Sequence, residues 1–142
     1  MVADADIIRE RLDKIRQHRL LLEKFSAWDV PKLAGDYEEQ MKILHLLQIA
    51  IEASMDIAAH IISAEQLGVP VDHADLFRIL GSHKIIEENF VSAFQDMARF
   101  RNRLAHFYMG MDLERVAFVL HNNLRDFDLF AEAIEKYLGR AR

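Results

Sequence analysis

A long stretch of helical periodicity in the first half of the chain limits the folds open to it. Mostly apolar residues recur four and three positions apart in one series: Tyr37, Met41, Leu44, Gln48, Ile51, Met55, Ala58 and Ile62. A second series runs beside the first: Ile43, Leu47, Ala50, Ser54, Ile57 and Ile61. Two adjacent series form a wide buried face, which predicts a central helix over about residues 36–66 with neighbours on two sides. Gly68 and Pro70 are expected to end this helix.

Three further helical series and one short helix complete the pattern. The long series cover about residues 4–26, 82–110 and 112–138, and Trp28 and Pro31 are expected to end the first. Asp72 is a suitable N-cap for a short helix through Leu80. No sustained alternation and no Asn-Gly or Asp-Gly turn predicts a strand. The sequence predicts an all-α, up-and-down bundle of four long helices plus one short helix, in a single domain over residues 1–142.

Composition narrows the function classes. The chain has no cysteine, so it can build neither a disulfide framework nor a thiolate metal site. It has no signal-like apolar segment near its start and no stretch of about 18 or more apolar residues. A net charge of −5 argues against a broad surface for nucleic acid, because affinity for phosphates comes from clustered Lys and Arg. These observations favour a cytoplasmic protein without a membrane partner.

One segment reverses the average charge. The sequence RFRNRLAHFYMG, residues 99–110, lies in a window from Asp96 to Asp112 that contains no acidic residue between its ends. Its basic residues are Arg99, Arg101, Arg103 and His106. A local basic site is therefore compatible with an acidic chain.

A helical wheel separates the polar residues of this segment. At roughly 100° per residue, Asn102 and His106 share the polar face, whereas Arg101 and Tyr108 lie at the border of the buried face. Arg101 and His106 therefore cannot easily grip one small group from a straight helix. Either the helix distorts near Gly110, or a second copy of the segment completes the site from another subunit.

The residue types suit the cleavage of phosphodiesters. A guanidinium stabilises charge that develops on phosphorus, a histidine moves protons near neutral pH, and an asparagine can position either group. RNA carries its own nucleophile in the 2′-hydroxyl, so a positioned base and a charge stabiliser suffice without a metal. A structural explanation stays open, since arginines and a late histidine also complement the dipole at a helix C-terminus.

The segment resembles a known motif. RNRLAHFY matches the R-x4-H-x-Y pattern of HEPN-domain ribonucleases, and the chain resembles the HepT-type toxin of HEPN/MNT toxin–antitoxin pairs over nearly its whole length. LLQIAIEASMDIAAHII, in the central helix, resembles the second helix of that family. The resemblance implies a HEPN-like bundle in which Arg101, Asn102 and His106 are catalytic. Arg99 and Arg103 are expected to bind RNA.

The resemblance also implies an activity and partners. It predicts a metal-independent endoribonuclease without a cofactor, acting as a homodimer whose two motif helices line one cleft. In such type VII-like pairs the antitoxin is a minimal nucleotidyltransferase that transfers AMP to the motif tyrosine, here Tyr108. The main alternative is a HEPN module that binds or regulates the nucleotidyltransferase without cutting RNA. A plain helical adaptor is a further alternative.

A polar stripe on the central helix admits three interpretations. Its members are Gln48, Glu52, Asp56 and His60. The favoured interpretation is a solvent-exposed ridge; in the second, Glu52 or Asp56 orients an arginine of the motif helix; a metal site is the least supported. Many relatives carry an arginine where this chain has His45, which leaves a substrate contact from that position open.

Overall fold

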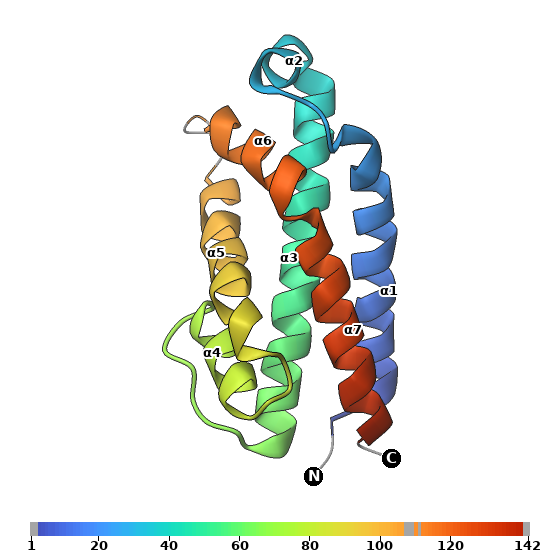
Figure 1. The fold of residues 1–142 in the computed structure, drawn as a ribbon, viewed down its shortest axis with the longest axis vertical. Coiled ribbons are helices and arrows are strands. Elements are labelled where there is room, and N and C mark those ends of the chain that lie inside the picture. Colours follow the sequence, from blue (N-terminus) through green and yellow to red (C-terminus); the bar gives the residue numbers. More distant parts are fainter. Residues whose placement is uncertain (1–2, 107–109, 111, 141–142) are drawn as a thin grey trace.

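The computed structural model describes residues 3–106, 110 and 112–140, and this part of the chain is all-α (Figure 1). Its elements in chain order are α1 (Ala5–Leu22), the 3-10 turn η1 (Glu23–Phe25), α2 (Val30–Gly35), α3 (Tyr37–Glu65), α4 (Asp75–Ser82), α5 (Glu88–Leu104), α6 (Leu113–Asn122) and α7 (Leu124–Arg140). The predicted fold class is confirmed, although the division into helices differs from the prediction in three places.

The central helix α3 is confirmed. Figure 1 shows it running along the bundle, with α1 and α7 on one side and α4 and α5 on the other. The Asp36 carboxylate caps its start by accepting a hydrogen bond from the Glu39 N–H at 3.1 Å. The helix ends before Gly68, because Gln66 adopts the left-handed conformation with φ of 54°. Most side chains of the two predicted series are buried, among them Ile43, Leu47, Ile51, Ile57 and Ile61, whereas Tyr37 at the start of the first series is exposed.

The first long helix ends as predicted, but Pro31 does not act as a terminator. Instead it lies in the first turn of α2, a short helix that the sequence analysis missed. Proline suits this position because its missing N–H would have no partner in the helix. Asp29 caps α2 through a 3.0 Å hydrogen bond from the Lys32 N–H.

The helix that carries the motif is shorter than predicted. It begins at Glu88 rather than near Ser82, because Lys84 takes a left-handed turn with φ of 60° after α4. At its other end the His106 N–H donates to the Arg103 carbonyl, three residues earlier, at 3.1 Å. This is the spacing of a 3-10 turn, and it replaces the bond to the carbonyl four residues earlier that an α-helix would make. α5 therefore ends at Leu104, and residues 107–109 lie outside the described part of the chain.

The predicted last helix is divided at Asn123. This residue has ψ of −1°, and its side-chain amide donates to the Asp126 carboxylate at 2.9 Å. The break separates α6, which contacts α2, from α7, which packs along α1. Apolar periodicity continues across the break, and for this reason the sequence pattern does not reveal it.

One described helix, α3, is long and apolar enough to cross a membrane. However, 61% of its most apolar window lies buried within the bundle. Core helices commonly share this length and composition, so the feature is weak evidence for a membrane span.

Candidate functional site

The C-terminal end of α5 is anchored in the core on one side and presents polar residues on the other. Phe100 and Leu104 are each 1% exposed and fix this end of the helix against the bundle. Arg101 lies at the border between this buried face and the solvent, with 26% of its side chain exposed. Its side chain is thus mostly buried, but part of it remains accessible to solvent.

Arg101 is bound by Glu52 from α3. The Glu52 Oε1 atom accepts hydrogen bonds from Arg101 Nη2 at 2.8 Å and from Arg101 Nε at 3.0 Å. The Gln48 side-chain amide donates to the same oxygen at 3.2 Å. Charge-assisted bonds of this kind are stronger than neutral ones, and here they fix the direction of the guanidinium.

This contact decides between the interpretations of the polar stripe. For Glu52 the favoured interpretation, a solvent-exposed ridge, is wrong, and the interpretation in which it orients a motif arginine is confirmed. Asp56 does not share this role, since it lies 3.7 Å from the Arg11 Nε atom on α1. Among the described residues, no three His, Asp or Glu side chains form a group that could hold a metal ion.

The other motif residues divide as the helical wheel predicts. Asn102 and His106 are exposed, and His106 lies in the turn that follows α5. The half-buried Arg101 and the exposed pair are thus on different faces of one segment. Tyr108, the predicted site of modification, lies outside the described residues. His45 is exposed on α3.

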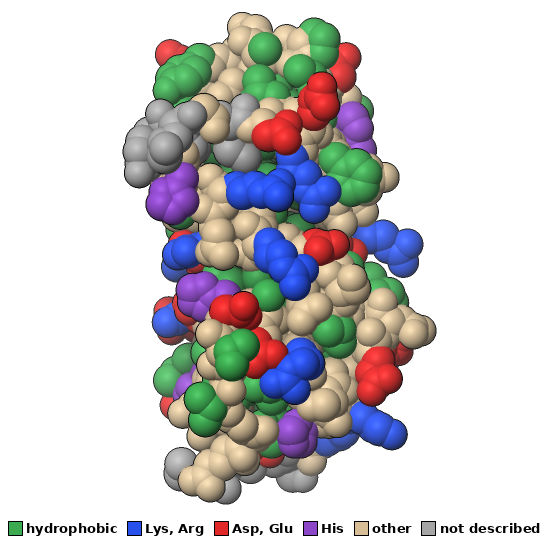
Figure 2. All heavy atoms as spheres, turned by 90° about the vertical axis from the view of Figure 1, so that its left-hand side faces the viewer, with side chains coloured by type: hydrophobic (Ala, Val, Ile, Leu, Met, Phe, Trp, Pro, Cys, Tyr) green, Lys and Arg blue, Asp and Glu red, His purple; other side chains and the backbone are tan. Residues whose placement is uncertain are grey.

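The arginines predicted to bind RNA line a surface depression of about 260 Å³. Arg99 and Arg103 contribute to it from α5 and Arg115 from α6, together with Asp96 and Phe100. Figure 2 shows this side of the molecule, where Lys and Arg side chains gather on the surface. The sequence analysis missed Arg115. The one feature of the sequence that could have pointed to Arg115 is its place in the first turn of a helix, where the helix dipole disfavours a positive charge.

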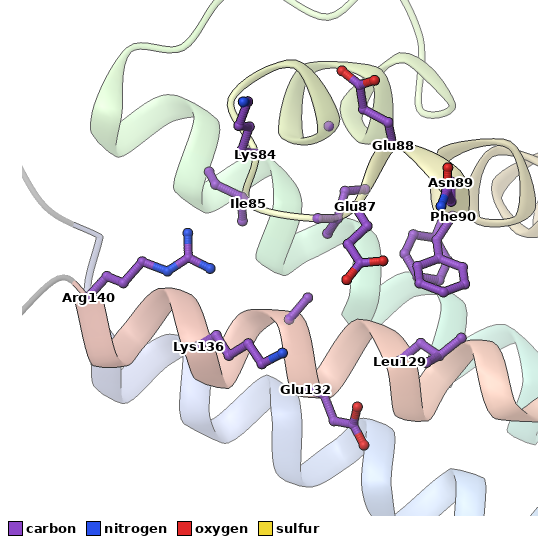
Figure 3. A pocket seen from close by; sticks show the side chains of 14 residues that line it. Lys84, Ile85, Glu87, Glu88, Asn89, Phe90, Leu129, Glu132, Lys136 and Arg140 are labelled. Carbon is purple, nitrogen blue, oxygen red and sulfur yellow. The ribbon is translucent and has the colours of Figure 1, made fainter.

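A larger pocket, about 470 Å³, lies at the opposite end of α5. Figure 3 shows Lys136 and Arg140 of α7 and Glu87, just before α5, extending toward it. Its lining includes three basic side chains, Lys84, Lys136 and Arg140, and three acidic ones, Glu87, Glu88 and Glu132. A pocket of mixed charge suits a polyanion less well than the depression lined by three arginines.

Comparisons with known proteins agree with the motif. The model of the family described as Ribonuclease HepT-like matches residues 8–134. The mRNA nuclease HepT of Shewanella oneidensis is 32% identical over 107 residues, which cover 75% of this chain and 80% of that protein. The tRNA nuclease HepT of Aphanizomenon flos-aquae is 28% identical over 132 residues, covering 93% of this chain and 90% of that protein.

The fold is also similar to that of a solved toxin. The structure of the tri-AMPylated Shewanella oneidensis HEPN toxin in complex with MNT antitoxin gives a TM-score of 0.83 at 28% identity. The similarity covers 94% of this chain and 99% of that one. On the extent of the family match and the identity to its relatives, the chain belongs to the Ribonuclease HepT-like family.

Proposed function

We propose that this protein is the nuclease toxin of a type VII-like HEPN/MNT toxin–antitoxin pair and that it cleaves RNA in the cytoplasm. The observation that carries the proposal is the Arg101 guanidinium, held by Glu52 beside the exposed Asn102 and His106. Membership of a family whose relatives are named mRNA and tRNA nucleases supports RNA as the substrate.

In the proposed reaction, His106 acts as a general base and removes the proton from the 2′-hydroxyl of the RNA. The 2′-oxygen then forms a bond to phosphorus, and the bond from phosphorus to the 5′-oxygen breaks. Arg101 stabilises the charge on the five-coordinate phosphorus, and Asn102 positions the reacting groups. The departing 5′-oxygen takes a proton from water, leaving a 2′,3′-cyclic phosphate and a 5′-hydroxyl. The nucleophile belongs to the substrate, so the proposal requires no metal or cofactor.

The division of the motif between two faces supports a homodimer. Arg101 is half buried beside Glu52, whereas His106 is exposed in the turn after α5. Two copies related by a two-fold axis would bring Arg101 of one protomer toward His106 of the other. We therefore propose that the cleft is completed by a second copy of the chain.

Tyr108 is the proposed site of control. A cognate MNT-type nucleotidyltransferase would transfer AMP from ATP to the tyrosine hydroxyl, releasing pyrophosphate. The added phosphate carries negative charge, and the adenosine adds bulk, so RNA would be both repelled and blocked. AMPylation of the related Shewanella toxin in its antitoxin complex supports this regulation.

The test of catalysis is RNA cleavage by purified protein in excess chelator. We expect cleavage by the native chain and a loss of roughly 10²- to 10⁴-fold in folded His106→Ala, the range typical of a general acid–base residue. Arg101→Ala should also lose activity, and His73→Ala, an exposed histidine outside the motif, should not. Cleavage that survives both motif substitutions, or that needs added metal, would overturn the mechanism.

The regulation has its own test. The protein is co-produced with its nucleotidyltransferase, and intact mass is compared between the native chain and Tyr108→Phe. Increments of AMP on the native chain alone support modification of Tyr108. If no increment is found, simple blockade by the partner replaces the proposal. A folded protein that binds the nucleotidyltransferase but never cuts RNA would instead support the non-catalytic HEPN module.

A further inference from the structure

The depression between α5 and α6 is lined by three guanidinium groups from two helices. Arg99 is paired there, with its Nη1 atom 3.2 Å from the Asp96 Oδ1 atom. Neither Arg103 nor Arg115 makes an ion pair with any residue in the described part of the chain. Two unpaired arginines at one depression leave an excess of positive charge in an acidic protein.

Arg115 is the residue that nothing in the motif accounts for. Its Nε atom is buried and has no hydrogen-bond partner within the described structure. The guanidinium carbon lies 5.2 Å from the centroid of the Phe118 ring, a cation–π contact that holds the side chain in place. A buried donor without an acceptor is uncommon in folded proteins. Arg115 also lines the depression, so an anion bound there would give its guanidinium group an acceptor.

The position of Arg115 on its helix strengthens this argument. Arg115 lies in the first turn of α6, where the helix dipole opposes a cation. Asp112 caps that turn by accepting a hydrogen bond from the Arg115 N–H at 3.2 Å, so the carboxylate serves the backbone. Because this carboxylate already caps the start of the helix, attraction of an anion here comes from the guanidinium groups.

The depression is on the same side of α5 as the exposed part of the motif. At roughly 100° per residue, Arg99 and Arg103 lie about 160° from Arg101 in opposite directions, on the side of α5 that also carries Asn102. His106 follows in the turn after α5, where its N–H donates to the Arg103 carbonyl at 3.1 Å. A strand that passes His106 can therefore continue across Arg103 to Arg115. The volume of about 260 Å³ accommodates a phosphodiester group and part of a neighbouring sugar.

We propose that Arg103 and Arg115, with Arg99 at the edge, bind a backbone phosphate of the RNA outside the bond that is cleaved. This inference rests on the proposed ribonuclease function. Phosphate contacts position a strand without reading its bases, so this subsite contributes to affinity for all RNA sequences alike. Arg115 is thus a binding residue contributed by α6, outside the motif.

The experiment measures binding apart from cleavage. An RNA oligonucleotide with 2′-O-methyl groups cannot be cut, and its affinity for the full-length protein is followed by fluorescence anisotropy over a series of salt concentrations. In Arg115→Gln the slope of log K against log salt should become shallower by about 0.7, and binding at about 0.15 M salt should weaken about fourfold. Arg115→Lys keeps the charge and should keep the slope. Arg125→Gln removes an exposed arginine on α7 and should match the native chain.

The outcomes separate this subsite from the cleavage mechanism. On cleavable RNA, Arg115→Gln should raise KM more than it lowers kcat. If the native chain binds the oligonucleotide through Arg115 but cuts no RNA, the catalytic proposal fails and the subsite stands. If the native chain cuts RNA and a folded Arg115→Gln retains the native affinity, salt slope and KM, the subsite is wrong. Loss of binding to the nucleotidyltransferase with unchanged RNA binding would also overturn it, in favour of a protein interface.

Discussion

Arg101 and Glu52 meet across the contact between α5 and α3, with two nitrogens of the guanidinium bonded to one carboxylate oxygen at 2.8 and 3.0 Å. The two residues are 49 positions apart in the chain. Only the Nε and Nη2 atoms of Arg101 are used, so the Nη1 group takes no part in this contact. The candidate charge stabiliser is therefore oriented by a helix that lies outside the motif.

Replacing Glu52 tests this orientation. We expect Glu52→Ala to lower kcat/KM for RNA cleavage on the order of 100-fold, the effect of misplacing a reacting group by about 1 Å. Glu52→Gln keeps an acceptor for Arg101 and should retain more activity than Glu52→Ala. Single-turnover cleavage with protein in excess over RNA but below saturation measures kcat/KM for both variants.

A neighbouring carboxylate provides the control. Asp56 lies one turn along α3 from Glu52 and faces Arg11 rather than the motif. Asp56→Ala should therefore cleave RNA at the native rate. Native activity in a folded Glu52→Ala protein would show that Arg101 does not need this partner.

The anchoring of the motif helix leads to a prediction about stability. Leu104→Ala removes a fully buried side chain at the last turn of α5 and should lower the free energy of unfolding by about 2–5 kcal/mol. Asn102→Ala, on the exposed face of the same turn, should change it by less than about 0.5 kcal/mol. Urea unfolding at a fixed protomer concentration measures both, since dimerisation would make stability depend on concentration. Similar losses in the two variants would contradict the burial pattern.

Periodicity predicts the elements whose faces are buried continuously. α3 is found where two adjacent apolar series place it, because together they form a wide face that contacts helices on both sides of α3. The exposure of Asn102 and His106 follows from the same reasoning on α5. Local pattern therefore suffices for the fold class and for the division of the motif between two faces.

Features that depend on a few polar contacts are not predicted in this way. The break at Asn123 rests on a bond to Asp126 within one turn, and the apolar series on either side conceals it. The sequence offered Glu52 or Asp56 as a partner for an arginine of the motif helix, as an alternative to a solvent-exposed ridge. Which carboxylate meets which arginine depends on how α3 and α5 are rotated against each other. Such rotation is set by packing across the whole bundle, which no single segment encodes.

A contact between α7 and α3 predicts an unusual tyrosine. The Tyr137 hydroxyl donates to the Glu65 Oε2 atom at 2.5 Å. Burial, and then the bond to Glu65, raise the pKa of Tyr137 from 10.0 to about 12. Because the pKa is raised in the folded state, the stability from this group is complete below about pH 10 and is lost as the pH rises through about 12.

Ultraviolet titration checks this value. The difference between the native chain and Tyr137→Phe isolates the ionisation of one tyrosine. Glu65→Gln removes the negative charge while burial remains, so the pKa of Tyr137 should fall but stay above its ordinary value. Ionisation of Tyr137 near pH 10 in the folded native chain would show that neither burial nor the hydrogen bond to Glu65 raises the pKa of Tyr137.

Asp126 provides the last prediction, which concerns a buried carboxyl group at the start of α7. Burial raises its pKa above 3.8, against the opposing effects of the Asn123 hydrogen bond and the Arg125 charge. The folded state therefore binds the proton more tightly than the unfolded state does. Its stabilising contribution is complete below about pH 3.8 and is lost as the pH rises through the raised pKa, leaving a buried charge at neutral pH.

Asp126→Asn removes that charge and should make the protein more stable than the native chain at pH 7. The substitution keeps an oxygen that can accept the hydrogen bond from the Asn123 amide. The gain should shrink as the pH falls through the raised pKa of Asp126, because the native carboxyl then becomes neutral as well. Urea unfolding of both proteins at pH 4 and pH 7 measures the difference. A variant that is less stable at pH 7, or a gap that does not change with pH, would mean that the Asp126 carboxylate is compensated in the fold.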